Sequence, residues 1–502
     1  MAAPSMMVSV REILLEQTER TRQRSRADIQ RFIKDSELKI ASLESQISAL
    51  IELRDCEHAY VAALRHLTSP IHTLPVELLA EIFKLVVTVT DIKDVFRISQ
   101  VCSDWRQLAH RTTRLWTAPI RVELQSRTAT SEGLYVDGLK ALFTRSDPHP
   151  IHVSLVSLAD HRIPEEVLRF APRWRSLELK LPHNLYTPLP LVSQLAECRF
   201  DSLEELELER AFRRDISDPS RIISFSQVPR LRKLRMKIYS NAMPILIPWD
   251  QLTDLVLDCE TLDIALDILS QCRHLVIARV VTRPLPAQAE RDILALSHMR
   301  ALTLELYDSD GFVGMPILDY LLAPALEELF LNFAGVAAMQ WAEAFTAFQL
   351  RSPNITRLAL DLNSGAMITS DDLMAVIRHA PSLNCLKLSE YMRCLDDAFI
   401  GALYYQEDTR PLLPRLHSLI LHVPEPEFSF TEAVLAGMIA SRWWTDAELA
   451  LHFSPRAAAR WGFVQLQGGF STDFTDMMKT LQHRGLPLVL LDTSGRPFSP
   501  MS

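Results

Sequence analysis

One leucine pattern, L-x-x-L-x-L, recurs through most of this 502-residue chain and constrains its fold more than any other feature. Clear copies are LEELEL (203–208), LRKLRM (231–236), LEELFL (326–331) and LHSLIL (416–421). The fourth positions of the copies align as Leu177, Leu206, Leu234, Leu255, Ala278, Leu302, Leu329, Leu358, Leu386 and Leu419. These positions are spaced by roughly 20 to 33 residues, and alternate residues of a strand share one face. The pattern therefore predicts stacked units that each add one strand to a common core.

Helix-compatible segments separate the copies, for example residues 368–380 and 429–444. Strand–helix units of this length are typical of leucine-rich repeats, so we predict an α/β solenoid over residues 150–455. Most copies lack the asparagine of the repeat pattern, and the repeats are therefore degenerate. Residues 118–149 are predicted to be a linker, and residues 456–502 to be a C-terminal cap that contributes a last strand.

Residues that alternate with the core leucines should project from the surface of the strands. The candidate target-binding residues on this surface are Glu207, Glu209, Arg235, Lys237, Phe330 and Lys387. The surface changes sign along its length, because residues 207–209 are acidic and residues 235–237 are basic. Phe330 is of the aromatic type that is enriched at binding hot spots. The alternative is a solvated repeat face on which a given residue contacts no ligand.

A long segment without glycine or proline, residues 26–68, follows an N-terminus (1–25) that we predict to be flexible. Its apolar residues recur at alternating steps of four and three, as at Ile40, Leu43, Ile47 and Leu50. Such a seam faces a partner helix, although polar residues interrupt it at positions 36, 54 and 57. The segment is predicted to be either a coiled coil that joins two copies of the chain, or a long amphipathic helix folded back on its own chain.

Residues 71–117 form a short block that is rich in large apolar residues. LPVELLAEIF (74–83) has helical spacing, with Thr73 as a candidate N-cap and Pro75 suited to the first turn. A second helical run follows, and Leu115 and Trp116 close the block. A unit this small buries too little surface to be stable by itself, and an apolar face that it cannot bury implies a partner. The alternative is that the surplus packs on the following domain of the same chain.

The order and spacing of these residues resemble an F-box motif. The matching pieces are Leu74-Pro75-x-Glu77-Leu78-Leu79-x-x-Ile82-Phe83, then Val101-Cys102-x-x-Trp105-Arg106, then Leu115-Trp116. The segment VVTVTDIKDVF (86–96) is longer and more β-branched than is usual in this family. The series of long helix, F-box and irregular repeats is similar to expanded F-box families of basidiomycete fungi.

The resemblance implies that the block docks a Skp-family adaptor and, through it, a cullin, within a Skp–cullin–F-box ubiquitin ligase. Carried over by motif position, the adaptor-binding residues are Leu74, Pro75, Leu78, Ile82, Phe83, Val101, Trp105, Leu115 and Trp116. The last four either hold the helices together or join the docking face. Plain core packing is the alternative for every one of the nine.

Composition and motifs argue against several other functions. The net charge of −9 gives no attraction to nucleic acid, and no apolar run is long enough to span a membrane. The seven cysteines include no CxxC and indicate reduced thiols in a cytoplasmic and/or nuclear protein. HExxH, GxSxG and GxGxxG are absent, and glycine, which phosphate-binding loops need, occurs only 13 times. We predict no catalytic residues, no metal and no cofactor.

These observations favour a non-catalytic substrate receptor, in which the F-box recruits the ligase and the repeats hold a target protein near the activated ubiquitin. A second hypothesis is a scaffold that keeps the adaptor contact but drives no degradation. A hydrolase-like enzyme in the repeat region is a third, which a deep pocket with convergent groups of shifted pKa would favour.

Overall fold

The chain divides into two compact units, Met1–Ile82 and Phe83–Ser502. The computed structural model describes residues 26–87, 92–124, 129–157, 163–180, 189–212, 223–238, 245–283, 291–307, 316–334, 341–362, 369–389, 394–407, 410–423, 429–446, 448 and 457–496. The expected flexible N-terminus, residues 1–25, lies outside these ranges.

The first unit is dominated by the helix α2 (Arg26–Leu67), which confirms the long helix expected over residues 26–68. Without glycine or proline, nothing in this segment interrupts helical hydrogen bonding. A short 3-10 helix, η1 (Pro70–Thr73), follows, and α3 (Val76–Val86) begins shortly after it. The expected N-cap is wrong, because the Thr73 hydroxyl donates to the Pro70 carbonyl at 2.6 Å within η1. The Pro75 carbonyl instead accepts the first helical bond of α3, from the Leu79 N–H at 3.1 Å.

The second unit opens with the short helical elements α4 (Lys93–Ser99), α5 (Ser103–Arg111) and η2 (Thr113–Thr117). Within the described residues, a sheet of fourteen parallel strands follows. Its strands are β1 (Ile120–Leu124), β2 (Ile151–Ser157), β3 (Trp174–Lys180), β4 (Glu205–Phe212), β6 (Lys233–Ile238), β8 (Asp254–Cys259), β9 (Ile277–Thr282), β11 (Ala301–Tyr307), β13 (Glu328–Ala334), β14 (Arg357–Leu362), β15 (Cys385–Ser389), β16 (Ser418–Val423), β17 (Phe463–Gly468) and β18 (Leu488–Leu491). Two minor parallel pairs are β5 (Ile223–Ser224) with β7 (Ile245–Leu246), and β10 (Leu294–Ala295) with β12 (Leu321–Leu322).

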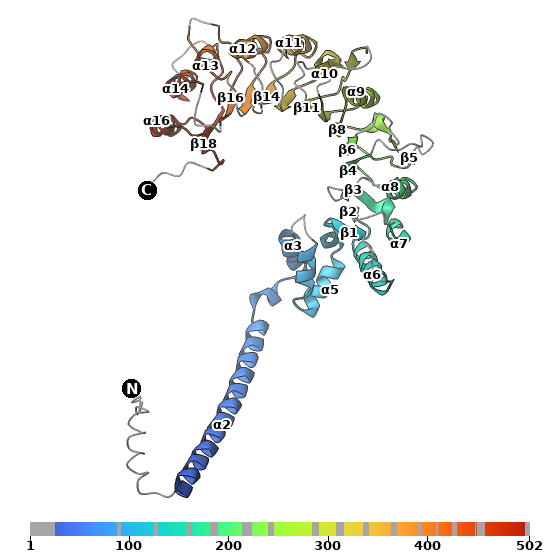
Figure 1. Cartoon of the computed structure of the whole chain (residues 1–502), viewed down its shortest axis with the longest axis vertical. Helices are drawn as coiled ribbons and strands as arrows, with labels where there is room; N and C mark the ends of the chain where they lie inside the picture. Colours follow the sequence, from blue (N-terminus) through green and yellow to red (C-terminus); the bar gives the residue numbers. More distant parts are fainter. Residues whose placement is uncertain are drawn as a thin grey trace. The chain divides into compact units, whose positions relative to one another are not determined.

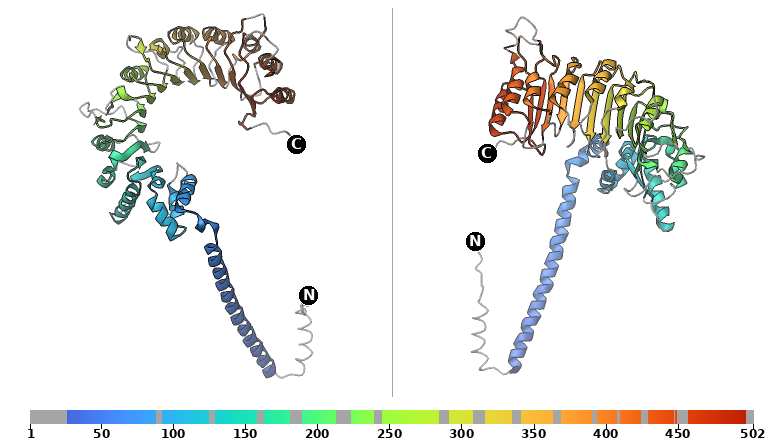
Figure 2. Two further views of the ribbon diagram at one scale, coloured as in Figure 1. Left: turned by 180° about the vertical axis from the view of Figure 1, so that it is seen from behind. Right: turned by 45° about the horizontal axis from the view of Figure 1, so that its top comes forward.

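Helices lie between most pairs of consecutive strands of the sheet. They are α6 (Ala129–Arg145), α7 (Glu165–Leu168), α8 (Leu189–Ala196), α9 (Leu262–Gln271), α10 (Pro316–Asp319), α11 (Trp341–Arg351), α12 (Ser370–Arg378), α13 (Asp397–Ala402), α14 (Glu432–Ser441) and α16 (Thr472–His483). In Figure 1 the helices α9 to α14 follow the outer side of the sheet and the strands line its inner side, and Figure 2 shows the same arrangement in two further views. This parallel-strand series is consistent with a solenoid.

The strand register confirms the alignment that the leucine pattern predicts. The ten aligned positions, Leu177 to Leu419, are direct neighbours from β3 to β16. All ten are buried, and together with the buried apolar residue two positions later in each strand they form one continuous core between sheet and helices. Burial of so many aliphatic side chains, at about 1.5–3 kcal/mol each, holds the stacked units together.

Residues 118–149 differ from the linker that was expected. They contain β1 and α6, and β1 pairs with β2 along its whole length, so this segment is the first unit of the sheet. Its strand, IRVEL, has the alternation of a repeat strand but lacks the leading leucine of the pattern. At the other end, residues 456–502 contribute two strands, β17 and β18, with α16 between them.

Three cysteines lie in the interior of the solenoid, Cys259, Cys272 and Cys394. Burial raises the pKa of each thiol to about 12, because the thiolate loses its hydration. We therefore expect these three to react with iodoacetamide at pH 8 at least about a hundredfold more slowly than the exposed Cys56. Peptide mass spectrometry after timed labelling measures the rates, and labelling in denaturant is the control. Equal rates for Cys56 and the other three thiols in the native protein would contradict the burial of Cys259, Cys272 and Cys394.

Candidate functional site

The helix α3 carries apolar residues around most of its circumference. Leu79 and Phe83 are buried. Leu78, Ile82 and Val86, at four-residue steps along the same helix, remain exposed, and the Leu78 side chain is 53% exposed. Leu85 is 86% exposed and lies three residues after Ile82, although it is not one of the F-box motif positions. The helix therefore presents an apolar stripe to solvent, which isolated soluble helices rarely do without a partner.

Phe83 and Trp105 hold the helical block together from within. Phe83 is 1% exposed, and its ring lies 4.8 Å from the half-buried ring of Trp105 on α5. The neighbouring Arg106 donates its Nε–H to the Ser99 carbonyl at 2.9 Å, which ties α5 to the end of α4. Of the two roles considered for Trp105, internal packing is the one that this contact supports.

Leu115 and Trp116 on η2 are also interior residues. The Trp116 indole donates to the Ala109 carbonyl at 2.8 Å, and its ring meets Phe96 edge-on at 5.6 Å. The guanidinium of Arg145, on α6, lies 4.8 Å from the same ring. Trp116 thus joins the helical block to the first helix of the solenoid. Of the two roles considered for it, holding helices together and joining the docking face, these contacts support the first.

The remaining motif residues lie where a partner could reach them. Leu74 is half-buried between η1 and α3, and Pro75 is exposed at the start of α3. Val101 is exposed in the turn between α4 and α5, where its N–H donates to the Ile98 carbonyl at 3.3 Å.

On the strand surface, the acidic and basic residues of β4 to β8 pair with one another. Glu207 lies beside Arg235 in the register, and their side chains are 3.3 Å apart. Lys237 is 2.5 Å from Asp258 on β8. These partly exposed pairs contribute little to stability, about 0–1 kcal/mol each, but they neutralise the change of sign that the sequence suggests. Glu209 is in β4, and its side chain lies outside the described set.

The central strands carry polar atoms that have no such partners. Phe330 on β13 and Lys387 on β15 are half-buried and flank Ala359 of β14 in the register. Two residues further along, Asn332 lies beside Asp361, and one side-chain oxygen of each is buried without a hydrogen-bond partner among the described residues. Buried polar oxygens without partners are costly and call for an explanation.

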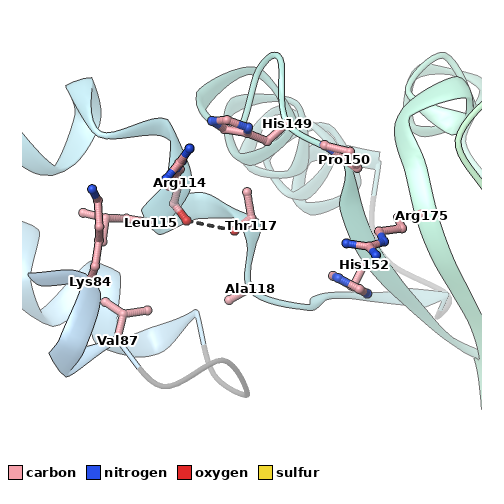
Figure 3. Close-up of a pocket in the computed structure, with 10 residues that line it drawn as sticks. All are labelled: Lys84, Val87, Arg114, Leu115, Thr117, Ala118, His149, Pro150, His152 and Arg175. Atoms are coloured by element: carbon pink, nitrogen blue, oxygen red, sulfur yellow. Dashed lines mark hydrogen bonds between the residues drawn. The ribbon is translucent and has the colours of Figure 1, made fainter. Parts of the chain in front are cut away.

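A pocket of about 380 Å³ lies among the end of α3, η2 and the strands β2 and β3 (Figure 3). Its basic lining residues are Lys84, Arg114, His149, His152 and Arg175, and none of the lining residues that the structure describes is Asp or Glu. Figure 3 shows His152 and Arg175 close together on the two neighbouring strands. Burial lowers the pKa of His152, and Arg175 lowers it further, while Glu205 and Glu204 oppose this effect. His152 is therefore mostly neutral at pH 7.

Several polar side chains in the lining of this pocket already have interaction partners. Arg175 already forms an ion pair with Glu204 at 2.9 Å, and Lys84 also has an interaction partner. The Thr117 hydroxyl in the lining donates to the Arg114 carbonyl at 2.8 Å. Across the described ranges, no group of three or more His, Cys, Asp or Glu side chains is placed to hold a metal ion.

Comparison with known proteins identifies the helical block. A family model described as F-box-like matches residues 71–121, so the chain contains an F-box-like domain there. No curated protein matches the chain.

Among solved structures, the chain is similar to a chain of the Drosophila Toll–Spatzle complex, with 12% identity and a TM-score of 0.31. The match covers 74% of this chain and 50% of that one, so the chain spans about half the length of that relative. A likeness this weak carries no argument about function. No helix in the described parts of the chain has both the length and the apolar character that crossing a membrane requires.

Proposed function

We propose that this protein is a non-catalytic receptor of a Skp–cullin–F-box ubiquitin ligase. Its F-box-like domain would bind a Skp-family adaptor and, through it, a cullin, and its solenoid would bind a target protein. The solenoid units would be degenerate leucine-rich repeats. The chain would do no chemistry itself, because holding the target near the activated ubiquitin raises their effective concentration.

The exposed apolar stripe of α3 carries this proposal. Leu78, Ile82 and Leu85 lie within the segment matched as F-box-like and face solvent in the free chain. Covering each of them with a partner would contribute about 1.5–3 kcal/mol, which suffices for a specific complex once the cost of association is met. The interior residues Phe83 and Trp116 would shape the domain without touching the adaptor.

The central strands β11 to β15 are the surface that we propose for the target. On β4 to β8 oppositely charged side chains pair with one another, whereas Asn332 and Asp361 each have one buried oxygen without a hydrogen-bond partner in the described part of the chain. A partner that donates hydrogen bonds to these oxygens would relieve a cost of about 1–3 kcal/mol for each buried group. Phe330 and Lys387 lie close enough in the register to join the same contact.

Self-association through α2 is part of the same proposal. The seam residues Ile40, Leu43, Ile47 and Leu50 are exposed on a helix of 42 residues. A second copy of the chain would cover them.

The adaptor contact is tested with the double variant Leu78→Asp, Ile82→Asp. We expect it to weaken binding of a purified Skp-family adaptor at least about a hundredfold, because two apolar anchors become charges that resist burial. Titration calorimetry measures the affinity. Leu350→Asp is the matched control, since Leu350 is an equally apolar, 72% exposed residue on α11, outside the F-box-like segment.

The double variant and the Leu350→Asp control should both unfold at the wild-type temperature, because all three substituted side chains face solvent. Undiminished adaptor binding by the double variant would refute the docking stripe. If the adaptor binds but the assembled ligase transfers no ubiquitin to any captured target, the protein is a scaffold rather than a degradation receptor.

A further inference from the structure

The long helix α2 has a seam of apolar side chains that its own unit leaves uncovered. Ile40, Leu43 and Leu50 are 55%, 57% and 65% exposed. Ile33, Ile47, Val61 and Leu64 extend the seam in both directions and are exposed as well. A helix of 42 residues is roughly 60 Å long, so this seam is far too long for one small cluster of side chains to cover.

The type of residue at each seam position is informative. When the seam is written as the a and d positions of a heptad, Ile33, Ile40, Ile47 and Val61 occupy a, and Leu43, Leu50 and Leu64 occupy d. Every apolar a residue is β-branched, and three of the four apolar d residues are leucine, the exception being Ile29. The polar residues of the seam are Arg54 at a, and Ser36 and Glu57 at d. This combination favours two-stranded, parallel coiled coils, because the side chains at a and d enter their holes at different angles in that arrangement.

We propose that two copies of the chain pair through α2 as a parallel, in-register coiled coil. The inference rests on the self-association proposed above and adds its orientation and register. The second copy is the occupant that the residue pattern specifies, since identical helices in register place like positions opposite each other along the whole seam.

The charges beside the seam agree with this orientation. Lys39 precedes Ile40 and occupies a g position, and Glu44 follows Leu43 at an e position. In a parallel pair each g residue faces the e residue five positions later on the partner. Lys39 of each copy therefore meets Glu44 of the other, which gives two complementary ion pairs for each dimer.

Two antiparallel registers compete with this arrangement, one that spans the whole seam and one that pairs the charged residues of the seam. The latter sets Arg54 opposite Glu57 of the second copy, and it stacks Leu50 on Val61 and Ile47 on Leu64. That register uses only the C-terminal half of α2 and leaves Ile33, Ile40 and Leu43 uncovered. The parallel register covers the same four apolar residues and these three in addition, so it buries nearly twice as many apolar seam residues as that register. The antiparallel register that pairs Ile33 with Leu64 covers all seven, but it sets the charged Arg54 and Glu57 against Leu43 and Ile40.

A disulfide placed at the end of the seam distinguishes the two orientations. In the full-length chain, Leu64→Cys is combined with Cys56→Ser, which removes the exposed native thiol of α2. The two introduced thiols would be adjacent in the parallel dimer, at a distance that a disulfide spans. In either competing antiparallel register they would be roughly 25 Å apart or more, beyond the reach of any disulfide. We expect mild oxidation to convert most of the variant into covalent dimer, and the parent with Cys56→Ser alone to remain uncrosslinked.

A matched pair of surface substitutions gives an independent readout. Ile40→Asp places a charge in the seam and should convert the dimer to a monomer of 57.1 kDa in light scattering. Leu38→Asp is its control, because Leu38 is 62% exposed on the same helix but lies outside the seam. It should leave the mass at twice that of one chain.

The outcomes separate the orientation from the self-association on which it rests. If light scattering gave the mass of a single chain both for the wild type and for the protein without residues 1–67, both proposals would be overturned. Only the parallel arrangement would be overturned if the wild type were a dimer that becomes monomeric when residues 1–67 are removed, but the Leu64→Cys variant formed no disulfide and the Ile40→Asp variant remained a dimer. A disulfide in the Leu64→Cys variant together with dissociation by Ile40→Asp would establish the parallel arrangement. The two F-box-like domains follow α2 within a few residues, so they would then lie at the same end of the coiled coil.

Discussion

Replacing Trp116 with alanine is expected to lower the free energy of unfolding of the F-box-like block by about 3–5 kcal/mol. The side chain is fully buried, and the substitution leaves a large cavity where the indole met Phe96. It also leaves the Ala109 carbonyl without its donor and removes the ring beneath Arg145. Hydrogen exchange of the amides of α4 and α5, measured by mass spectrometry, reports this loss locally.

Trp116→Phe is the matched control for this prediction. It keeps most of the apolar volume but cannot donate to Ala109, so about 1–2 kcal/mol of destabilisation is expected. If Trp116→Ala left exchange in α4 and α5 unchanged but abolished adaptor binding, Trp116 would be a contact residue and the packing role described here would be wrong.

Replacing Arg442 with alanine is expected to destabilise the C-terminal part of the solenoid by about 3–5 kcal/mol. The Arg442 side chain is completely buried at the end of α14. Its guanidinium donates to the Leu403 carbonyl at 3.0 Å and to the Leu413 carbonyl at 2.8 Å, and it lies 5.6 Å from the Trp461 ring. Without it, two interior carbonyls lose their donors and a cavity opens between α14 and the segment before β16.

The pH dependence of this effect follows from the burial of the charge. Burial lowers the pKa of Arg442 to about 10, below its value of 12.5 in an unfolded chain. The cost of burying the charge is therefore fully present below about pH 10 and is relieved only as the pH rises from there towards 12.5. Between about pH 6 and 9 the difference in unfolding free energy between wild type and Arg442→Ala should be constant, as measured by urea denaturation.

Two variants sharpen the test of Arg442. Arg442→Lys retains the charge but cannot reach both carbonyls with one ammonium, so it should lose stability as well. Arg415→Ala removes an exposed arginine just before β16 and should change the unfolding free energy by less than about 0.5 kcal/mol. Equal stabilities of Arg442→Ala and Arg415→Ala would show that the buried guanidinium bonds do not stabilise the solenoid.

The register of the solenoid could be predicted from the sequence because leucine periodicity is a local property. Leu177, Leu206 and the eight positions aligned with them each follow the same short pattern, and parallel strands bring equivalent positions together. The strand β1 escaped prediction because IRVEL carries only part of the pattern. Its place in the sheet follows from its pairing with β2, a strand that the chain reaches only after the whole of α6.

The candidate docking site was predicted as a set of residues, but not as a surface. The motif selects Phe83 and Ile82 equally, yet Phe83 is packed against Trp105 and Ile82 faces solvent. When a helix is apolar around most of its circumference, as α3 is, the spacing of its apolar residues does not say which of them pack against the rest of the chain and which face solvent. Leu85, the most exposed apolar residue of α3, was not predicted as a docking residue for the same reason.

The amino-acid sequence by itself determined the repeat strands from β3 to β16, the positions of these strands that share the core, and that a long uninterrupted helix precedes an F-box-like block. These features depend on periodicity and on residue conformational preference, which act over a few neighbouring residues. Only the tertiary structure decided that Trp116 and Phe83 are interior and that Glu207 and Arg235 neutralise each other. It also decided that Asn332 and Asp361 each have an oxygen without a partner among the residues that the structure describes. Burial and ion pairing depend on contacts between residues distant in sequence, and no local pattern encodes which of several chemically equivalent partners will meet.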